Sequence, residues 1–281
     1  MSRFGIHGLA KTVSKWRHWP GCANPACKGN PLKHAVSKRH FGVWLSQEWF
    51  CGSDCFEQGA RKKIRELLTA RYSAEKPPAL RMPLGLLLLS RGILTHDQLK
   101  TALERQRSIG GSIGDIVQEF GFATAQQVTA AVAAQWACPV FSMGDRPPVT
   151  DVRIPRRLLE VYGMLPVHYS EVGGRLMVGF VTRVQHHLLY TIEHMTGCTA
   201  TPCFITAGDY RRGLESWSFI SAENDLTFDR ASSIGEIARM VRSYVNQAGA
   251  ESARFGVCQD FLWVRVRGRQ EIDLLFRLEG T

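Results

Sequence analysis

The sequence predicts a protein of the α+β class, and three observations carry that prediction. Four cysteines stand in two pairs within the first 71 residues. One 24-residue pattern with helical spacing occurs twice between residues 83 and 135. After residue 150, strand-like and helix-like runs alternate. Four parts are therefore expected: a basic four-cysteine segment over 1–71, a helical tandem-repeat module over 82–141, a small α/β sandwich over 150–218, and a helix plus β-hairpin over 232–281.

The first segment has the cysteine pattern of a metal-stapled fold. Its cysteines are Cys22, Cys27, Cys51 and Cys55. The spacing is C-x4-C, then 23 residues, then C-x3-C. Two such pairs supply four thiolates to a tetrahedral structural zinc ion and leave no open position for catalysis. The order of knuckle, hairpin, knuckle and helix resembles a treble-clef zinc finger, so a zinc-finger-like segment is expected. His34 and His40 are alternatives for one ligand.

The positive charge of the chain is concentrated in its N-terminal part. The net charge is +10, and residues 1–81 alone hold 15 Lys and Arg against 5 Asp and Glu. The remaining 200 residues are neutral overall. Tryptophans are interleaved with these basic residues, a pattern that suits nucleic acid or an anionic membrane surface. A solvated basic surface around the metal-stapled fold is the alternative.

The tandem-repeat module contains two aligned copies of one supersecondary unit. The first copy is Pro83–Gln106 and the second is Ser112–Gln135. Glycine stands at the third and tenth places of each copy, and glutamine closes each one. Apolar residues at helical spacing, broken at the second glycine, predict a short helix, a glycine turn and a longer helix. Thr95 and Thr124 are expected to cap the longer helices. Two helical hairpins related by a pseudo-twofold axis follow.

This double motif resembles the MshEN domain, the N-terminal module of type II secretion and type IV pilus ATPases. The matching positions singled out as ligand-binding are Leu84, Gly85, Leu88, Leu89, Gly92 and Gln106, and in the second copy Ile113, Gly114, Gly121 and Gln135. The resemblance implies that these residues bind cyclic di-GMP, as the best-known members of the family do. It also implies a partner protein in secretion or pilus machinery.

The leading arginine of the family motif is missing from both copies. Pro83 takes its place in the first copy and Ser112 in the second. An arginine guanidinium is suited to stacking on guanine and to bidentate contact with its acceptor edge. Arg81 and Arg107 lie nearby in sequence and are candidates to replace it. Nucleotide binding and partner docking therefore both stand as hypotheses for the module.

The C-terminal half alternates between helix and strand. Helices are expected over 155–162, 186–195 and 209–217, with strands over 164–169, 175–181 and 200–205. This order also resembles the second half of the secretion-ATPase N-terminal region. A polar loop with Asp225 and Asp229 follows. A helix over 234–254 and strands over 260–268 and 271–278 are expected to complete the chain.

The sequence favours a protein that is not an enzyme. It contains no G-x-x-x-x-G-K-[ST] phosphate loop, so ATP hydrolysis of the family's kind is not expected. No apolar run reaches the length of a membrane span, and a cytoplasmic location is expected, with the inner face of the membrane as one place of action. The leading hypothesis is a non-catalytic regulatory or adaptor protein that docks a partner or senses a cyclic dinucleotide. The alternatives are a zinc-finger nucleic-acid-binding protein with the module as its sensor, and a degenerate relic of an enzyme.

Overall fold

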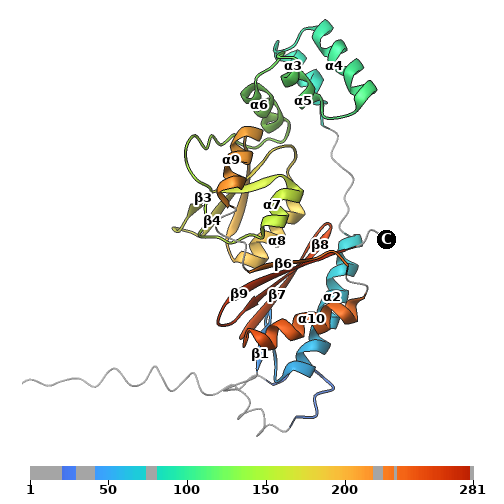
Figure 1. Ribbon diagram of the computed structural model, residues 1–281, viewed down its shortest axis with the longest axis vertical. Coiled ribbons are helices and arrows are strands. Elements are labelled where there is room, and N and C mark those ends of the chain that lie inside the picture. The colour runs from blue at the N-terminus through green and yellow to red at the C-terminus, as the bar shows by residue number, and fades with distance from the viewer. Residues whose placement is uncertain (1–20, 30–41, 74–80, 218–223, 231–232, 279–281) are drawn as a thin grey trace, which may run out of the picture.

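The computed structural model describes residues 21–29, 42–73, 81–217, 224–230 and 233–278. The mixed α+β class is confirmed, because helices and two separate sheets share this part of the chain. Figure 1 shows the tandem-repeat module at one end of the long axis, an α/β subdomain in the middle, and a larger sheet with two helices at the other end. Within the described residues, no helix is both long and apolar enough to cross a membrane.

The tandem-repeat module consists of four helices. They are α3 (Leu84–Ser90), α4 (His96–Ile109), α5 (Ile113–Glu119) and α6 (Ala125–Gln135). Thr95 and Thr124 form capping boxes at the starts of α4 and α6, each with a glutamine three residues on. Gly92 and Gly121 stand in the turns before these caps, both with a φ of +68°. The predicted helix, glycine turn and helix are thus present in both copies.

The α/β subdomain contains one three-stranded sheet. Its elements are α7 (Arg156–Tyr162), β3 (Met164–Ser170), β4 (Arg175–Phe180), α8 (His186–Thr196), β5 (Thr199–Phe204) and α9 (Ala207–Trp217). The strand order is β3-β4-β5, with the first pair antiparallel and the second parallel. The chain leaves the module beside β5, where the Phe141 N–H donates to the Phe204 carbonyl (2.8 Å) and the Phe204 N–H to the Pro139 carbonyl (2.9 Å).

The larger sheet joins the two ends of the described chain. Its strands are β1 (Val43–Leu45), β2 (Glu48–Phe50), β6 (Asp225–Phe228), β7 (Ser252–Cys258), β8 (Phe261–Arg267) and β9 (Glu271–Arg277). The two helices that pack on it are α2 (Ser53–Ser73) and α10 (Ile234–Gln247). The strand order is β2-β1-β7-β8-β9-β6. Because β1 lies parallel to β7, the hairpin of the cysteine-bearing segment and the C-terminal strands form one sheet.

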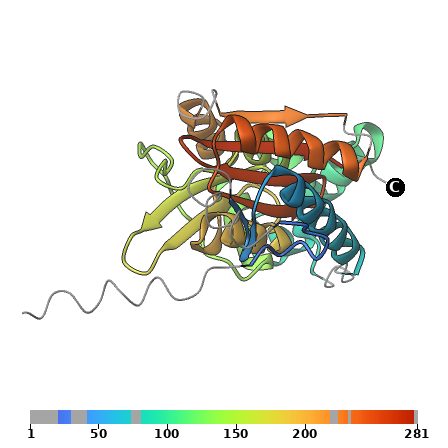
Figure 2. The same ribbon diagram turned by 90° about the horizontal axis from the view of Figure 1, so that it is seen from below.

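Each face of the larger sheet belongs to a different hydrophobic core. Helices α2 and α10 lie side by side against one face, where Leu262 and Val264 are fully buried (Figures 1 and 2). Helix α8 of the α/β subdomain packs on the other face, where Trp263 joins the core that extends up to the module. The alternation of side chains along β8 therefore lets one strand serve both cores.

The C-terminal part differs from the expectation in two places. The helix expected over 234–254 ends at Gln247, because Gly249 takes a left-handed φ of +56° just after it. Residues 252–254, expected as the end of that helix, instead begin β7 (Ser252–Cys258), which has alternating burial. The expected hairpin is present as β8 and β9, but it is the middle of a six-stranded sheet.

A buried ionic cluster locks the α/β subdomain to the sheet. Arg265 is 2% exposed and Asp273 is fully buried, and the two form a bidentate ion pair. The Arg265 Nε lies 2.8 Å from the Asp273 Oδ1, and the Arg265 Nη2 lies 2.9 Å from the Asp273 Oδ2. Arg153, which precedes α7, binds the Asp225 carboxylate at 2.6 Å and accepts a hydrogen bond from Arg265 on its carbonyl. Burial raises the pKa of Asp225, against the opposing effect of Arg153. The expectation of a polar loop at Asp225 is wrong, since this residue begins β6 and is part of the lock.

Candidate functional site

The two copies of the module are held together by reciprocal hydrogen bonds from their closing glutamines. Gln106 Nε2 donates to the carbonyl of Gly111 (2.8 Å), and Gln135 Nε2 donates to the carbonyl of Met82 (2.5 Å). Gly111 and Met82 are the residues directly before the second and the first copy. The last residue of each copy therefore binds the residue just before the other copy. This exchange is what a pseudo-twofold axis between the copies requires.

The first glycine of each copy lies where two helices approach closely. A Cβ at Gly85 would lie 2.7 Å from the Leu99 Cδ1, and one at Gly114 would lie 3.2 Å from the Val128 Cγ1. Leu99 and Val128 occupy the same place in their copies. Alanine is a better helix former than glycine, so close packing accounts for glycine at these two positions.

The ten positions predicted to bind ligand all lie in this four-helix unit, at different depths. Leu88, Gly85 and Gly114 are buried, and Leu84, Leu89 and Ile113 are partly buried. Gly92 and Gly121 are exposed in the turns, and Gln106 and Gln135 are partly exposed. Their part in binding a nucleotide stays a prediction.

The positions of the missing motif arginines begin helices. Pro83 precedes α3, and Ser112 caps α5 by accepting a hydrogen bond from the backbone N–H two residues on (3.2 Å). The guanidinium of Arg81 stacks over the Trp136 ring, 3.6 Å from its centroid. Of the two arginines considered as replacements, Arg81 is therefore engaged within the module, whereas Arg107 is exposed in the last turn of α4.

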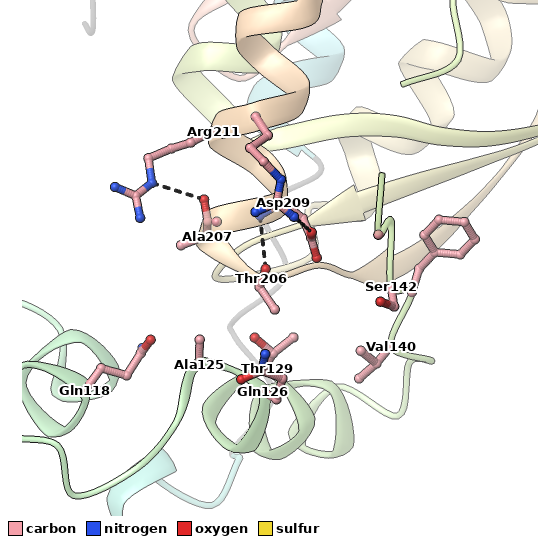
Figure 3. A pocket seen from close by; sticks show the side chains of 14 residues that line it. Gln118, Ala125, Gln126, Thr129, Val140, Ser142, Thr206, Ala207, Asp209 and Arg211 are labelled. Carbon is pink, nitrogen blue, oxygen red and sulfur yellow. Dashed lines mark hydrogen bonds and ion pairs between the residues drawn. The ribbon is translucent and has the colours of Figure 1, made fainter. Parts of the chain in front are cut away.

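A cavity of about 440 Å³ lies where the module meets the α/β subdomain (Figure 3). Side chains from α5 and α6 form one wall, and the start of α9 faces them across the cavity. We call this the junction cavity. The residues that line it include Gln118, Gln126, Thr129, Phe141, Thr206 and Arg211.

The polar groups of the junction cavity gather around the N-terminus of α9. The Thr206 hydroxyl accepts a hydrogen bond from the Asp209 N–H (3.0 Å), and the Asp209 carboxylate is paired with Arg212. Arg211 Nε donates only to the Ala207 carbonyl (3.4 Å), and no carboxylate of the described chain pairs with its guanidinium. The junction cavity was missed at the sequence level because it combines α5 and α6 with residues some 80 positions later.

The four predicted zinc ligands come together in space. The Sγ atoms of the four predicted cysteines all lie within 4.8 Å of one another. Cys27 and Cys51 are 3.6 Å apart, and Cys51 and Cys55 are 3.7 Å apart. A zinc–sulfur bond of about 2.3 Å places tetrahedral sulfurs about 3.8 Å apart. The cluster thus fits a zinc ion. His34 and His40 lie outside the described residues.

The surroundings of the cluster favour the thiolate at Cys27 and disfavour it at Cys51 and Cys55. The Gly29 N–H donates to the Cys27 Sγ (3.4 Å) and lowers the pKa of that thiol, while burial raises the pKa values of Cys51 and Cys55. Asn24 donates to the Cys55 Sγ (3.3 Å), which partly offsets that burial. Four thiolates at such distances repel one another, so a bound cation is what allows all four to ionise.

Comparison with known proteins supports the relationship predicted from the sequence. No family model matches the chain. The chain is 26% identical over 121 residues to the type IV pilus assembly ATPase PilB of Thermus thermophilus, a match that covers 42% of this chain and 14% of PilB. The predicted resemblance to the N-terminal region of secretion and pilus ATPases is confirmed.

The chain was also matched to solved structures. A structure of MshE with cyclic di-GMP is 21% identical and covers 48% of this chain and 98% of its own, with a TM-score of 0.41. A structure of the N-terminal domain of XpsE is 17% identical and covers 48% of this chain and 93% of its own, with a TM-score of 0.37.

Proposed function

We propose that this chain is a non-catalytic regulatory adaptor of a type II secretion or type IV pilus system, and that its tandem-repeat module docks a protein of that machinery. The similarity to a pilus assembly ATPase supports the choice of system. The absence of a phosphate-loop motif from the sequence supports a role without ATP hydrolysis. Docking to an inner-membrane component would place the chain at the inner face of the membrane.

The docking role is supported by the contacts that polar side chains of the module make with the module itself. Gln106 and Gln135 hold the two copies together, and Arg81 is stacked on an aromatic ring. Recognition of guanine and phosphate needs donors that are free to turn toward the ligand. One N–H of each glutamine amide is bonded and the ring stack fixes the plane of the Arg81 guanidinium, so these groups are less free to turn toward a ligand. A protein surface is therefore a better-matched partner than a cyclic dinucleotide.

Exposed apolar side chains in and around the first copy, and one at the end of α5, support docking through this part of the module. Of the ten large apolar residues exposed in the described chain, five lie between 82 and 120: Met82, Leu86, Leu103, Ile109 and Phe120. Leu103 is 38% exposed, whereas Val132, at the same place in the second copy, is 6% exposed. Helix α6 packs on β5 of the α/β subdomain, and α4 has no such neighbour in the described chain. The side of α4 that corresponds to the packed side of α6 is therefore exposed.

The proposal includes a structural role for the four-cysteine cluster. A zinc ion held by the four thiolates would tie the segment around Cys22 and Cys27 to the start of α2, which carries Cys55. The metal supplies cross-linking and no open coordination position. Its role would be to hold the β1–β2 hairpin in place beside β7.

The docking role is tested by affinity measurements on module variants. The full chain is titrated against the cytoplasmic domain of the inner-membrane assembly component from the same secretion or pilus system, using biolayer interferometry. Leu103→Asp and Leu86→Asp should each weaken binding at least about tenfold, or about 1.4 kcal/mol. Val172→Asp is the matched control, because Val172 is 91% exposed and lies outside the module. Equal affinities for all four proteins, or no binding by the unmodified chain, would contradict the proposal.

A further inference from the structure

We infer that a cleft at the edge of the larger sheet is a binding site for a small sugar phosphate. The cleft has a volume of about 520 Å³ and opens where β1 ends, between α2 on one face of the sheet and α8 on the other. We call it the edge cleft. The inference does not depend on the docking role, because no residue of the tandem-repeat module lines the edge cleft. Basic side chains from three elements and an unpaired buried hydroxyl carry the inference.

The basic side chains of the edge cleft are only partly neutralised. Lys62 and Lys63 come from α2, His194 from α8 and Arg254 from β7. Lys62 lies 3.9 Å from Glu66, which also lines the cleft, so these two charges partly cancel. Lys63 and Arg254 are both partly buried, and no carboxylate of the described chain lies within ion-pair distance of either. Cations that are neither paired nor fully solvated favour a bound anion.

The guanidinium of Arg254 is fixed in position and still has free donors. Its Nη1 donates to the carbonyls of His194 (3.3 Å) and Met195 (3.4 Å) at the end of α8. Its Nε and Nη2 have no hydrogen-bond partner among the described residues, and neither atom is buried. Burial, and then the nearby charges of Arg267 and Arg265, lower the pKa of Arg254. The two free donors suit the parallel hydrogen bonds that arginine makes to phosphate oxygens.

The pKa of His194 shows the effect of the positive charges in the edge cleft. It is lowered by burial of part of the ring, and then by the charges of Arg254 and Lys63. A bound anion would offset these two charges and raise the pKa of His194 toward or above its usual value of about 6.5. Arg254, Lys63 and His194 would then donate from three elements. Three directions of approach suit the three terminal oxygens of a phosphate group better than the two of a carboxylate.

A buried hydroxyl without a partner is an independent sign that a polar ligand belongs in the edge cleft. Ser46 lines the cleft at the turn between β1 and β2, and its Oγ is buried and makes no hydrogen bond. Such groups are rare, because an unpaired buried hydroxyl loses its water without compensation. Rotation about the Cα–Cβ bond moves this hydroxyl among three staggered positions. A ligand in the edge cleft can thus supply the missing partner.

The size and the remaining lining favour a sugar phosphate over inorganic phosphate and over a nucleotide. A volume of about 520 Å³ is in the range of sites for small molecules. Leu45 is the one apolar side chain among the described lining residues, which include no Phe, Tyr or Trp for a base to stack on. Gln47 and Glu48 supply amide and carboxylate groups that form hydrogen bonds with hydroxyls. A phosphate with several hydroxyls beside it matches this set.

The test is calorimetric titration of the full chain with glucose 6-phosphate and ribose 5-phosphate, and separately with inorganic phosphate. At least one sugar phosphate should bind with a Kd below about 1 mM. Lys63→Gln and Arg254→Gln should each weaken that binding at least about tenfold, and Ser46→Ala should weaken it by a smaller factor. Arg65→Gln is the matched control, because Arg65 is an exposed cation on the same helix as Lys63 but does not line the edge cleft.

A second measurement reads the site directly. The pKa of His194, followed by NMR and assigned with His194→Gln, should rise when the sugar phosphate saturates the chain, because the anion offsets the neighbouring charges. Lys63→Gln makes no printed contact that folding depends on, so it separates loss of binding from the loss of the Arg254 contacts at the end of α8.

Four results would overturn the inference. The first is that neither sugar phosphate gives saturable heat, and the second is that the pKa of His194 does not change at saturation. The third is that Lys63→Gln and Arg65→Gln weaken binding equally, because this would indicate unspecific attraction to positive charge. The fourth is that inorganic phosphate binds as tightly as both sugar phosphates, which would remove the organic part of the ligand. None of these results bears on the docking role, whose test uses Leu86 and Leu103.

Discussion

At the scale of single residues, the four glycines of the repeated pattern have two different reasons to be glycine. Gly85 and Gly114 are needed because side chains of a neighbouring helix fill the space of a Cβ. Gly92 and Gly121 have open space around them but a backbone that L-residues rarely adopt. The sequence pattern identified all four positions. The pattern alone does not say what lies beside Gly85 and Gly114, and the structure shows that side chains of a neighbouring helix lie there.

The turn glycines provide a first prediction. Replacing Gly92 or Gly121 by alanine should lower the free energy of unfolding by about 1 kcal/mol in each case, since left-handed backbone costs an L-residue roughly that much. The two losses should be equal, because both glycines have a φ of +68°. Urea denaturation of the full chain measures them, and asparagine at the same sites should cost less. A loss at one site without a loss at the other would contradict the equivalence of the two copies.

At the scale of secondary-structure elements, a buried carboxylate ties α2 to α10. Glu57 on α2 is 8% exposed and accepts a hydrogen bond from Arg242 on α10 (2.8 Å). Burial alone would raise the pKa of Glu57, but the hydrogen bonds from Arg242 and Arg61 lower it below its usual value. A carboxylate whose pKa is lowered by folding stabilises the protein above its unfolded pKa, and this contribution is lost as the pH falls through the folded pKa.

The second prediction follows from the lowered pKa of Glu57. Glu57→Gln should lower the free energy of unfolding at neutral pH, and the difference from the unmodified chain should shrink below about pH 4. Denaturant titrations across this pH range measure it. Glu66→Gln is the control, because Glu66 lies on the same helix but is 53% exposed and 3.9 Å from its partner Lys62. The prediction would be wrong if the loss of stability in Glu57→Gln stayed constant with pH or equalled the loss in Glu66→Gln.

Local sequence patterns predicted most elements, and their failures have a physical cause. The helices and strands between 155 and 217 follow from hydrophobic periodicity because each has a buried side of its own. The sequence predicts helix over residues 252–254, the start of β7, because the preceding apolar pattern continues across Gly249. Its identity as a strand comes from partners distant in sequence: β8 on one side and β1 on the other. Long-range pairing of this kind leaves no local signal.

At the scale of the whole molecule, the four-cysteine cluster and the C-terminal strands belong to one structural unit. The hairpin that follows the first cysteine pair contributes β1 and β2 to the larger sheet, and α2 packs on α10. The third prediction is that the full chain binds one zinc ion and that Cys51→Ser loses it. Hydrogen exchange should then become faster in β1, β2 and β7, while β3 to β5 remain protected. Mass spectrometry under native conditions measures the metal content.

A second cysteine variant controls for unspecific loss of metal. Cys138 follows α6 in the chain and is not part of the cluster. Cys138→Ser should retain the zinc ion and the exchange pattern of the unmodified chain. Unchanged zinc content in Cys51→Ser would refute the four-thiolate site, and faster exchange throughout the molecule would refute its restriction to the sheet.

The sites of the molecule differ in how far the sequence could predict them. The cysteine cluster was predictable because spacing alone nearly determines a four-thiolate site. The junction cavity was not, because Thr129 and Arg211 are ordinary residues on two helices until the folded chain places them on opposite sides of one cavity. The engagement of Gln106 and Gln135 in the module was also hidden, since the same residues fit a ligand-binding motif.

A calorimetric titration of the full chain with cyclic di-GMP distinguishes a module that docks a protein from one that binds a cyclic dinucleotide. Because Pro83 and Ser112 replace the motif arginines and both closing glutamines are engaged, we predict no saturable heat up to about 100 μM ligand. Saturable binding in that range, lost in Gln106→Ala and Gln135→Ala, would contradict the account and would identify the module as a nucleotide sensor.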